Sequence, residues 1–326
     1  MIVMRIGMAG VIVAAIAASA AEFPQAEISA SGVRARLYLP DAEKGYYRAT
    51  RFDWAGVIPS LEWKGHSYFG QWFERYDPKL HDAIDGPVES FRAIGYDEAE
   101  PGGTFLRIGV GLLRKPDAQK LNDFKTYDIA DGGKWTVTPH PDSVEFVHEL
   151  PGWYVYRKVV RLASDKPRLV IEHHLQNTGS KLIDTDVYNH DFFMLDGQPS
   201  GPDVTVQFPF DARAAADLKG LVEVREKNLL YLKQFEKGQS IYSLIEGFAA
   251  TPADYDIRVE NRKSGAGVRQ TSDRPMSKLA FWSIVTTVCP EAYTAVRVEP
   301  GRDFAWTVAW DFYEVGRNSA IQRPDR

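Results

Sequence analysis

The chain has 326 residues, of which 44% are hydrophobic and 25% are charged, values typical of a globular protein with a buried core. The net charge of −5 and the lack of a basic stripe argue against a protein that neutralises nucleic-acid phosphates. The sequence contains no linker-like tract, long charge run or repeat, so we expect one large domain over residues 22–326. Its single cysteine, Cys289, excludes an intrachain disulfide and is expected to be a small buried side chain.

The first 21 residues have the pattern of a secretory signal peptide. Arg5 supplies a positive charge, an apolar run follows over residues 6–17, and small residues at 18–21 form a cleavage site. The run is short for a membrane span, which needs about 20 apolar residues. We therefore expect a periplasmic or secreted protein with no membrane span after cleavage; an uncleaved anchor is the alternative.

From about residue 28 to residue 315 the pattern is that of short strands separated by turns. Polar and apolar side chains alternate over residues 34–39, 135–138, 143–148, 155–162 and 168–175. Glycine-containing turn sequences stand at residues 101–103, 131–133, 177–180 and 300–301. Only residues 212–232 could form a helix, and Gly220 weakens that pattern. Many short strands with few helices predict an all-β sandwich or barrel.

Three segments place titratable side chains in predicted loops or at predicted strand ends. They are residues 79–91 with His81, residues 186–196 with His190, and residues 288–293 with Glu291. Loops held by a rigid sheet can bring such side chains to one substrate. Considered singly, each has a structural alternative, because a histidine beside Asn and Asp is most often a hydrogen-bonded structural residue.

Together and in this order, the three segments resemble the motifs of aldose 1-epimerases. Residues 188–197, Tyr-Asn-His-Asp-Phe-Phe-Met-Leu-Asp-Gly, resemble the family's Asn-His-x-Tyr-Phe-Asn-Leu-x-Gly signature. Leu80-His81, followed by Gly86, is similar to its Leu-His-Gly-Gly loop with an insertion. Residues 289–293 are similar to the Cys-x-Glu-Pro-Trp stretch of epimerase-like relatives. The resemblance implies a large antiparallel β-sandwich of the galactose mutarotase-like type with an open sugar cleft.

The resemblance also implies roles for individual residues. Glu291 would be the catalytic base, His190 the catalytic acid, and His81 would bind and polarise the sugar. The family's substrate-binding aspartate would correspond to Asp254 or Asp256.

Further substrate-binding candidates lie near these motifs. Arg75 is the candidate for a cation before His81, and Asn189 adjoins the predicted acid. Trp282 and Tyr293 could stack on a sugar face, with core packing as the alternative. The motifs depart from the family at residues 82–85 and 192–194, so a different or derivatised sugar is an alternative to free galactose or glucose.

Anomer interconversion suits a carboxylate and an imidazole. One group removes the proton of the C1 hydroxyl while the other protonates the ring oxygen, and no cofactor or metal is required. We expect a cationic His190, because Asp191 and Glu291 could lie close to it. The adjacent His173 and His174 should point to opposite faces of one strand, which prevents them from binding one metal together.

Three functions remain open at this point, all with a small-molecule sugar or an oligosaccharide as partner and with a monomer or homodimer as the assembly. A mutarotase requires that His190 and Glu291 lie together. Another sugar-active enzyme, such as a lyase, hydrolase or epimerase acting on a glycoside, is favoured by an elongated basic cleft. A non-catalytic carbohydrate-binding protein would have the two side chains exposed, separated and without perturbed pKa values.

Overall fold

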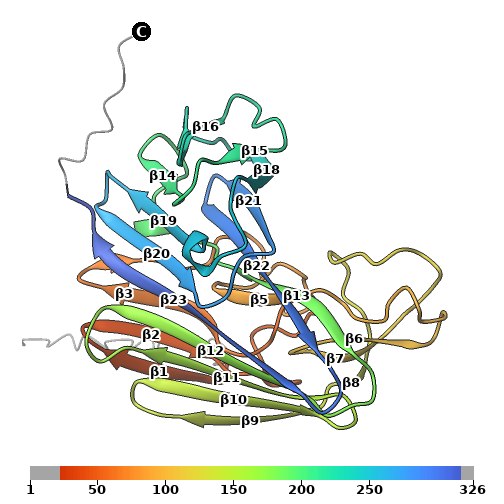
Figure 1. Cartoon of the computed structure of the whole chain (residues 1–326). Coiled ribbons are helices and arrows are strands. Elements are labelled where there is room, and N and C mark those ends of the chain that lie inside the picture. The colour runs from red at the N-terminus through yellow and green to blue at the C-terminus, as the bar shows by residue number, and fades with distance from the viewer. Residues whose placement is uncertain (1–22, 317–326) are drawn as a thin grey trace, which may run out of the picture.

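The computed structural model describes residues 23–316, so the predicted signal peptide at residues 1–21 lies outside the described residues. Almost all regular structure in this range is β-sheet (Figure 1). The two exceptions are short 3-10 turns, η1 (Leu195–Gly197) and η2 (Pro252–Asp254). No helix among the described residues is long and apolar enough to cross a membrane.

The largest sheet has ten antiparallel strands and forms one layer of the sandwich (Figure 1). In spatial order they are β16 (Val222–Arg225), β17 (Asn228–Tyr231), β14 (Val204–Gln207), β19 (Asp256–Asn261), β20 (Ala266–Ser272), β23 (Asp303–Glu314), β12 (Arg168–Asn177), β11 (Tyr154–Leu162), β10 (Ser143–Leu150) and β9 (Lys134–Pro139).

The second large sheet has six antiparallel strands and carries most of the candidate site. In spatial order they are β15 (Arg213–Ala214), β18 (Ser240–Glu246), β21 (Lys278–Ile284), β22 (Thr287–Val298), β13 (Ile183–His190) and β5 (Val88–Phe91). Two smaller sheets complete the described fold: β1 (Gln25–Ala30), β2 (Val33–Tyr38), β3 (Val57–Trp63) and β4 (His66–Ser67) form one, and β6 (Thr104–Arg107), β7 (Gly111–Arg114) and β8 (Ile129–Asp131) the other.

The alternation of side chains along the strands places the core between the sheets. In β10, Val144, Phe146 and Leu150 are fully buried on one face. They belong to the same apolar cluster as Val187 of β13 and Phe281 of β21, which come from the six-stranded sheet. Because side chains alternate between faces, the neighbours of these residues on β13 and β21 point away from the core. That second face holds the site.

The predicted strands over residues 34–39, 135–138, 143–148, 155–162 and 168–175 are confirmed as β2, β9, β10, β11 and β12. The opposite orientation of the two adjacent histidines is also confirmed. His173 is buried between the sheets, whereas nearly half of the His174 side chain is exposed.

The predicted helix at residues 212–232 is wrong, because this segment contains β15, β16 and β17. Gly220 and Glu226 have positive φ angles and interrupt any helix there. In addition, β17 alternates between buried and partly exposed side chains and pairs with β14. The pairing of the chain within the sheet thus outweighed a weak local helical preference.

Candidate active site

A cavity of about 580 Å³ lies on the face of the six-stranded sheet that points away from the core. The antiparallel register places Tyr188 of β13 directly opposite Tyr293 of β22. His190 lies two residues after Tyr188 on β13, and Glu291 lies two residues before Tyr293 on β22. Both side chains therefore point to the same face as the two tyrosines. β21 adds Trp282 to the wall, and residues 121–124 close the cavity from outside the sheet.

His190 and Glu291 are in contact at the base of the cavity. Nε2 of His190 lies 3.3 Å from Oε1 of Glu291, and both side chains are buried. The imidazole stacks on Phe192 with ring centroids 3.7 Å apart and meets the edge of Trp282 at 5.4 Å. Its Nδ1 is buried without a hydrogen-bond partner among the described residues. The sequence predicted these two residues as the acid–base pair, and the structure brings them together.

Burial acts on the two groups in opposite directions. Burial raises the pKa of Glu291 to about 7, although Arg51 and Lys278 act to lower it. Burial, together with the charge of Arg51, holds the pKa of His190 well below its usual value. The imidazole is therefore neutral at neutral pH, and the expectation of a cationic His190 is wrong.

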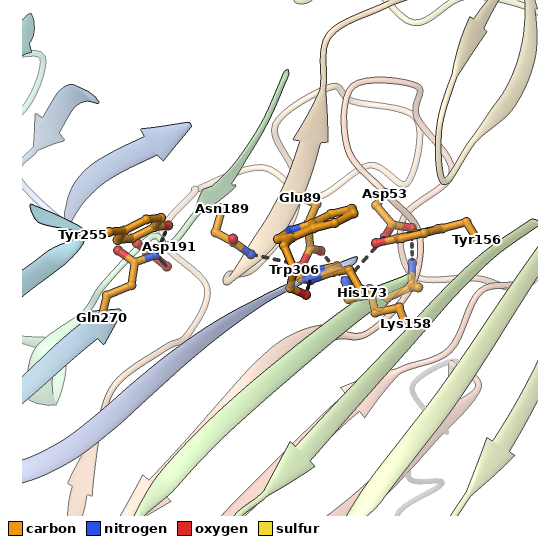
Figure 2. Close-up of polar contacts among 11 residues, drawn as sticks. Asp53, Glu89, Tyr156, Lys158, His173, Asn189, Asp191, Tyr255, Gln270 and Trp306 are labelled. Atoms are coloured by element: carbon orange, nitrogen blue, oxygen red, sulfur yellow. Dashed lines mark hydrogen bonds and ion pairs between the residues drawn. The ribbon is translucent and has the colours of Figure 1, made fainter. Parts of the chain in front are cut away.

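That expectation failed partly because Asp191 points elsewhere. Its Oδ1 accepts hydrogen bonds from Nε1 of Trp310 at 3.0 Å and Nε2 of Gln270 at 3.4 Å, as Figure 2 shows for Gln270. Burial raises the pKa of Asp191 well above its usual value, so it is a neutral acid on the core side. Adjacent residues in extended chain face opposite ways, which separates Asp191 from His190.

Three cations that the sequence analysis did not select also line the cavity, and one of them, Arg92, is paired with Asp186. Arg51, in the segment between β2 and β3, donates from Nη2 to the hydroxyl of Tyr188 at 3.3 Å. Lys278, on β21, places its ammonium 3.5 Å from the ring centroid of Tyr293. The alternation of β21 could have predicted Lys278, because it shares a face with Trp282. Arg51 has no periodic signal, since its segment is irregular.

Three of the other predicted site residues lie at or beside the cavity. Trp282 and Tyr293 are part of its wall. His81 adjoins Asp82, a wall residue, and its ring meets the edge of Phe124 at 5.3 Å between centroids. Burial lowers the pKa of His81. His81 is therefore at the rim, in contact with a residue of the wall.

Asn189 faces the core and not the cavity. Its side-chain amide donates to Oε1 of Glu89 at 3.0 Å, inside the sandwich (Figure 2). The prediction of Asn189 as a substrate ligand is therefore corrected: its position next to His190 on a strand sends its side chain to the opposite face.

Asp254, Asp256 and Arg75 also lie outside the cavity wall. Asp254 accepts a hydrogen bond from the backbone of Ala249, and Asp256 forms a two-point ion pair with Arg269 at 2.7 Å. Both aspartates lie in or next to β19, which belongs to the ten-stranded sheet, so the loose match to a substrate-binding aspartate placed them on the wrong layer. Arg75 is exposed and does not contribute to the wall.

No group of three or more metal-ligating side chains is assembled within residues 23–316. Cys289 is buried, and its Sγ accepts the backbone N–H of Phe192 at 3.2 Å. Burial raises the pKa of its thiol well above the usual value, which suits the predicted structural role.

Solved structures of similar fold define the class to which this architecture belongs. The chain superposes on a galactose mutarotase-like protein from Lactobacillus casei with a TM-score of 0.54 and 12% identity, over 89% of this chain and 100% of the other. For the GalM/aldose epimerase homologue from C. elegans the TM-score is 0.53 at 15% identity, over 90% of this chain and 99% of the other. For the Slr1438 protein from Synechocystis the TM-score is 0.56 at 13% identity, over 93% of this chain and 100% of the other.

The chain therefore has the galactose mutarotase-like fold, as the resemblance of its motifs implied. No protein-family model and no curated protein matches the sequence.

Proposed function

We propose that the protein is an aldose 1-epimerase-like enzyme that interconverts the anomers of a sugar. The observation that carries this proposal is the contact between Glu291 and His190 at the base of a cavity with aromatic walls. The cavity volume of about 580 Å³ is within the range of small-molecule sites. Tyrosine and tryptophan rings offer flat apolar surfaces of the kind on which a sugar face can stack.

The acid–base pair can complete the reaction without a net change in its own protonation. Below pH 7 the pair holds one proton, on the carboxyl of Glu291, because its pKa is raised and that of His190 is lowered. Transfer of this proton across the 3.3 Å contact yields a carboxylate and an imidazolium. The carboxylate then removes the proton of the C1 hydroxyl while the imidazolium protonates the ring oxygen.

These two transfers open the ring. The C1–O5 bond breaks, its electron pair goes to O5, and the C1 oxygen becomes a carbonyl oxygen. Rotation about the C1–C2 bond exposes the other face of the aldehyde, and the reverse transfers close the ring as the other anomer. Glu291 and His190 return to their starting states.

The perturbed pKa values and the buried contact of the pair favour a catalytic role over a purely carbohydrate-binding one. We also propose export to the periplasm or the medium, on the basis of the predicted signal peptide at residues 1–21. Cell fractionation of the full-length protein and of a variant without residues 1–21 tests that proposal. Export of the full-length protein that is lost in the variant supports it, and the same cytoplasmic location of both proteins contradicts it.

Polarimetry of freshly dissolved single anomers tests the enzymatic proposal. The rotation of α-glucose, α-galactose, pentoses and uronic acids is followed with the wild-type protein and with Glu291→Gln. We expect the wild-type protein to accelerate the approach to equilibrium for at least one sugar and Glu291→Gln to remove the acceleration. No acceleration with any free sugar would contradict the proposal.

A further inference from the structure

Two cations in the cavity lack a carboxylate partner. Among the described residues, no acid lies within 4.0 Å of the guanidinium of Arg51 or the ammonium of Lys278. Arg51 instead contacts the Tyr188 hydroxyl and two aromatic rings, those of Phe52 at 4.7 Å and Phe124 at 5.0 Å. Both cations are only half-buried, so each can still reach a ligand in the cavity.

The acids of the cavity wall contact basic side chains other than Arg51 and Lys278. Glu291 contacts His190, as described above. Asp123 pairs with Arg107 at 2.5 Å and Asp186 with Arg92 at 3.1 Å, whereas Asp82 lies 3.8 Å from His81, whose pKa is lowered by burial. Arg51 and Lys278 thus stand in the cavity without an acid at ion-pair distance, although the whole chain has a net charge of −5.

Each of the two cations contacts one member of a stacked pair of tyrosines. The rings of Tyr188 and Tyr293 are stacked with centroids 4.4 Å apart, Arg51 contacts Tyr188, and Lys278 contacts Tyr293. Both positive charges also act on the carboxyl of Glu291, so they lie close to the candidate acid–base pair. Both cations line the same cavity as the acid–base pair, so an anionic group of a bound sugar would meet them next to its reacting part.

Arg51 is held in this position by the protein around it. Its carbonyl oxygen accepts a hydrogen bond from Nη1 of Arg107 at 3.0 Å, and Arg107 is buried. Arg107 also holds Asp123 of the cavity wall. A guanidinium placed in advance, with free donors, suits the planar recognition of a carboxylate or a phosphate.

We propose that the substrate of this cavity is a sugar with an anionic substituent, a carboxylate or a phosphate, that is bound by Arg51 and Lys278. This inference rests on the proposed function and specifies its substrate class. In a hexuronic acid the carboxylate is attached to C5, the carbon bonded to the ring oxygen. A site that places O5 at His190 therefore also places this carboxylate close to the acid–base pair.

An anion at Arg51 has a further consequence for the chemistry. Arg51 is one of the causes that lower the pKa of His190, after burial. A bound anion offsets that positive charge and makes the imidazolium easier to form. The substrate would thus promote the proton transfer from Glu291 to His190 that opens its own ring.

Paired neutral and anionic sugars test the proposal. We would compare glucose and galactose with glucuronate, galacturonate and glucose 6-phosphate as single anomers, by polarimetry and by NMR. The variants are Arg51→Gln and Lys278→Gln, with Arg297→Gln and Lys237→Gln as controls that remove exposed cations outside the cavity. We expect a higher kcat/KM for an anionic sugar than for its neutral counterpart.

For the anionic sugar we expect each cavity variant to lower kcat/KM by at least about tenfold more than for the neutral sugar, whose rate changes only through the altered pKa values of Glu291 and His190. The controls should leave both unchanged. A preference for uronates over the phosphate identifies the carboxylate as the natural anion, and the reverse preference identifies the phosphate. Equal or better turnover of neutral sugars, with an equal effect of Arg51→Gln on neutral and anionic sugars, would overturn the inference and leave the proposed mutarotase activity intact.

Calorimetric titration separates the two proposals if no sugar is turned over. Binding of glucuronate or glucose 6-phosphate that weakens in Arg51→Gln and at raised salt supports the anion site and contradicts only the proposed reaction. Failure of every anionic sugar to bind overturns the anion site. Thermal unfolding of each variant shows whether a loss of binding reflects a loss of the fold.

Discussion

At the scale of single residues, the environment decides which group of the Glu291–His190 pair carries the proton. Burial favours the neutral form of both side chains, and Arg51 opposes the positive charge on the imidazole. The proton thus rests on the carboxyl, and the catalytic state requires its transfer to His190. This state is limited to the pH range in which the pair holds a single proton.

The pH dependence of kcat/KM follows from this protonation state. As the pH rises through about 7, Glu291 loses its proton, and the pair then has a base but no acid. The other charged groups that face Glu291 are Arg51 and Lys278, and both act to lower its pKa. We therefore expect kcat/KM for a neutral sugar to fall above pH 7, measured by polarimetry after subtraction of the buffer rate. A rate that stays level to pH 9 would rule out this protonation scheme.

At the scale of structural elements, a buried polar network joins the two large sheets beneath the site (Figure 2). Lys158 of β11 forms ion pairs with Glu89 of β5 and, at 3.4 Å, with Asp53. Glu89 also contacts Nε2 of His173 of β12 at 2.8 Å and the amide of Asn189 of β13. The ionisable side chains of this network are fully buried.

The charges of this network depend on one another. Burial acts to raise the pKa of Glu89, but Lys158 and His173 outweigh it and lower the pKa to about 2. Burial acts to lower the pKa of Lys158, but Glu89 and Asp53 outweigh it. Glu89 lies opposite Asn189 in the β5–β13 register, and Asn189 directly precedes His190 in the sequence. The network therefore also supports the strand that carries the candidate acid.

Removal of the central cation should destabilise the protein strongly. In Lys158→Met the carboxylate of Glu89 stays buried without its main counter-charge, which costs about 3–5 kcal/mol of unfolding free energy. The matched control is Lys64→Met, which breaks an exposed pair with Glu314 and should cost less than about 1 kcal/mol. Urea unfolding monitored by tryptophan fluorescence measures both. Equal losses in the two variants would show that the network contributes no more than a surface pair.

At the scale of the whole molecule, the stability should depend on pH through buried carboxyls that are neutral in the folded state. Asp85 is one of them: it is almost fully buried, and its Oδ1 has no partner among the described hydrogen bonds. Burial raises its pKa from 3.8 to about 7. Between these values the folded state binds a proton that the unfolded state has released, so a rise in pH lowers the stability.

This linkage gives a measurable difference in unfolding free energy between pH 5 and pH 8. The contribution of Asp85 is at most about 4 kcal/mol across the full interval. We expect wild-type protein to be less stable at pH 8 than at pH 5, and Asp85→Asn to reduce that difference because an amide does not ionise. Asp97→Asn, at an exposed position, is the control and should leave the difference unchanged. A difference as large in Asp85→Asn as in the wild type would contradict the assignment.

Much of the fold and part of the site could be predicted from the sequence. Alternating side chains within single strands identified β2, β9, β10, β11 and β12, because this periodicity is local and follows from the pleat. The short motifs around His190 and Glu291 identified the pair that the cavity brings together.

The tertiary structure decided what local pattern does not contain. The register between β13 and β22 placed His190 beside Glu291, and the two-residue alternation turned Asn189 and Asp191 away from the cavity. Arg51 reaches the cavity from an irregular segment 137 positions before Tyr188, a contact that no spacing in the sequence encodes. The strands at residues 212–232 likewise arose from pairing across the sheet. Strand class is a property of neighbouring residues, whereas a site depends on which distant segments pair and on which face each side chain leaves the sheet.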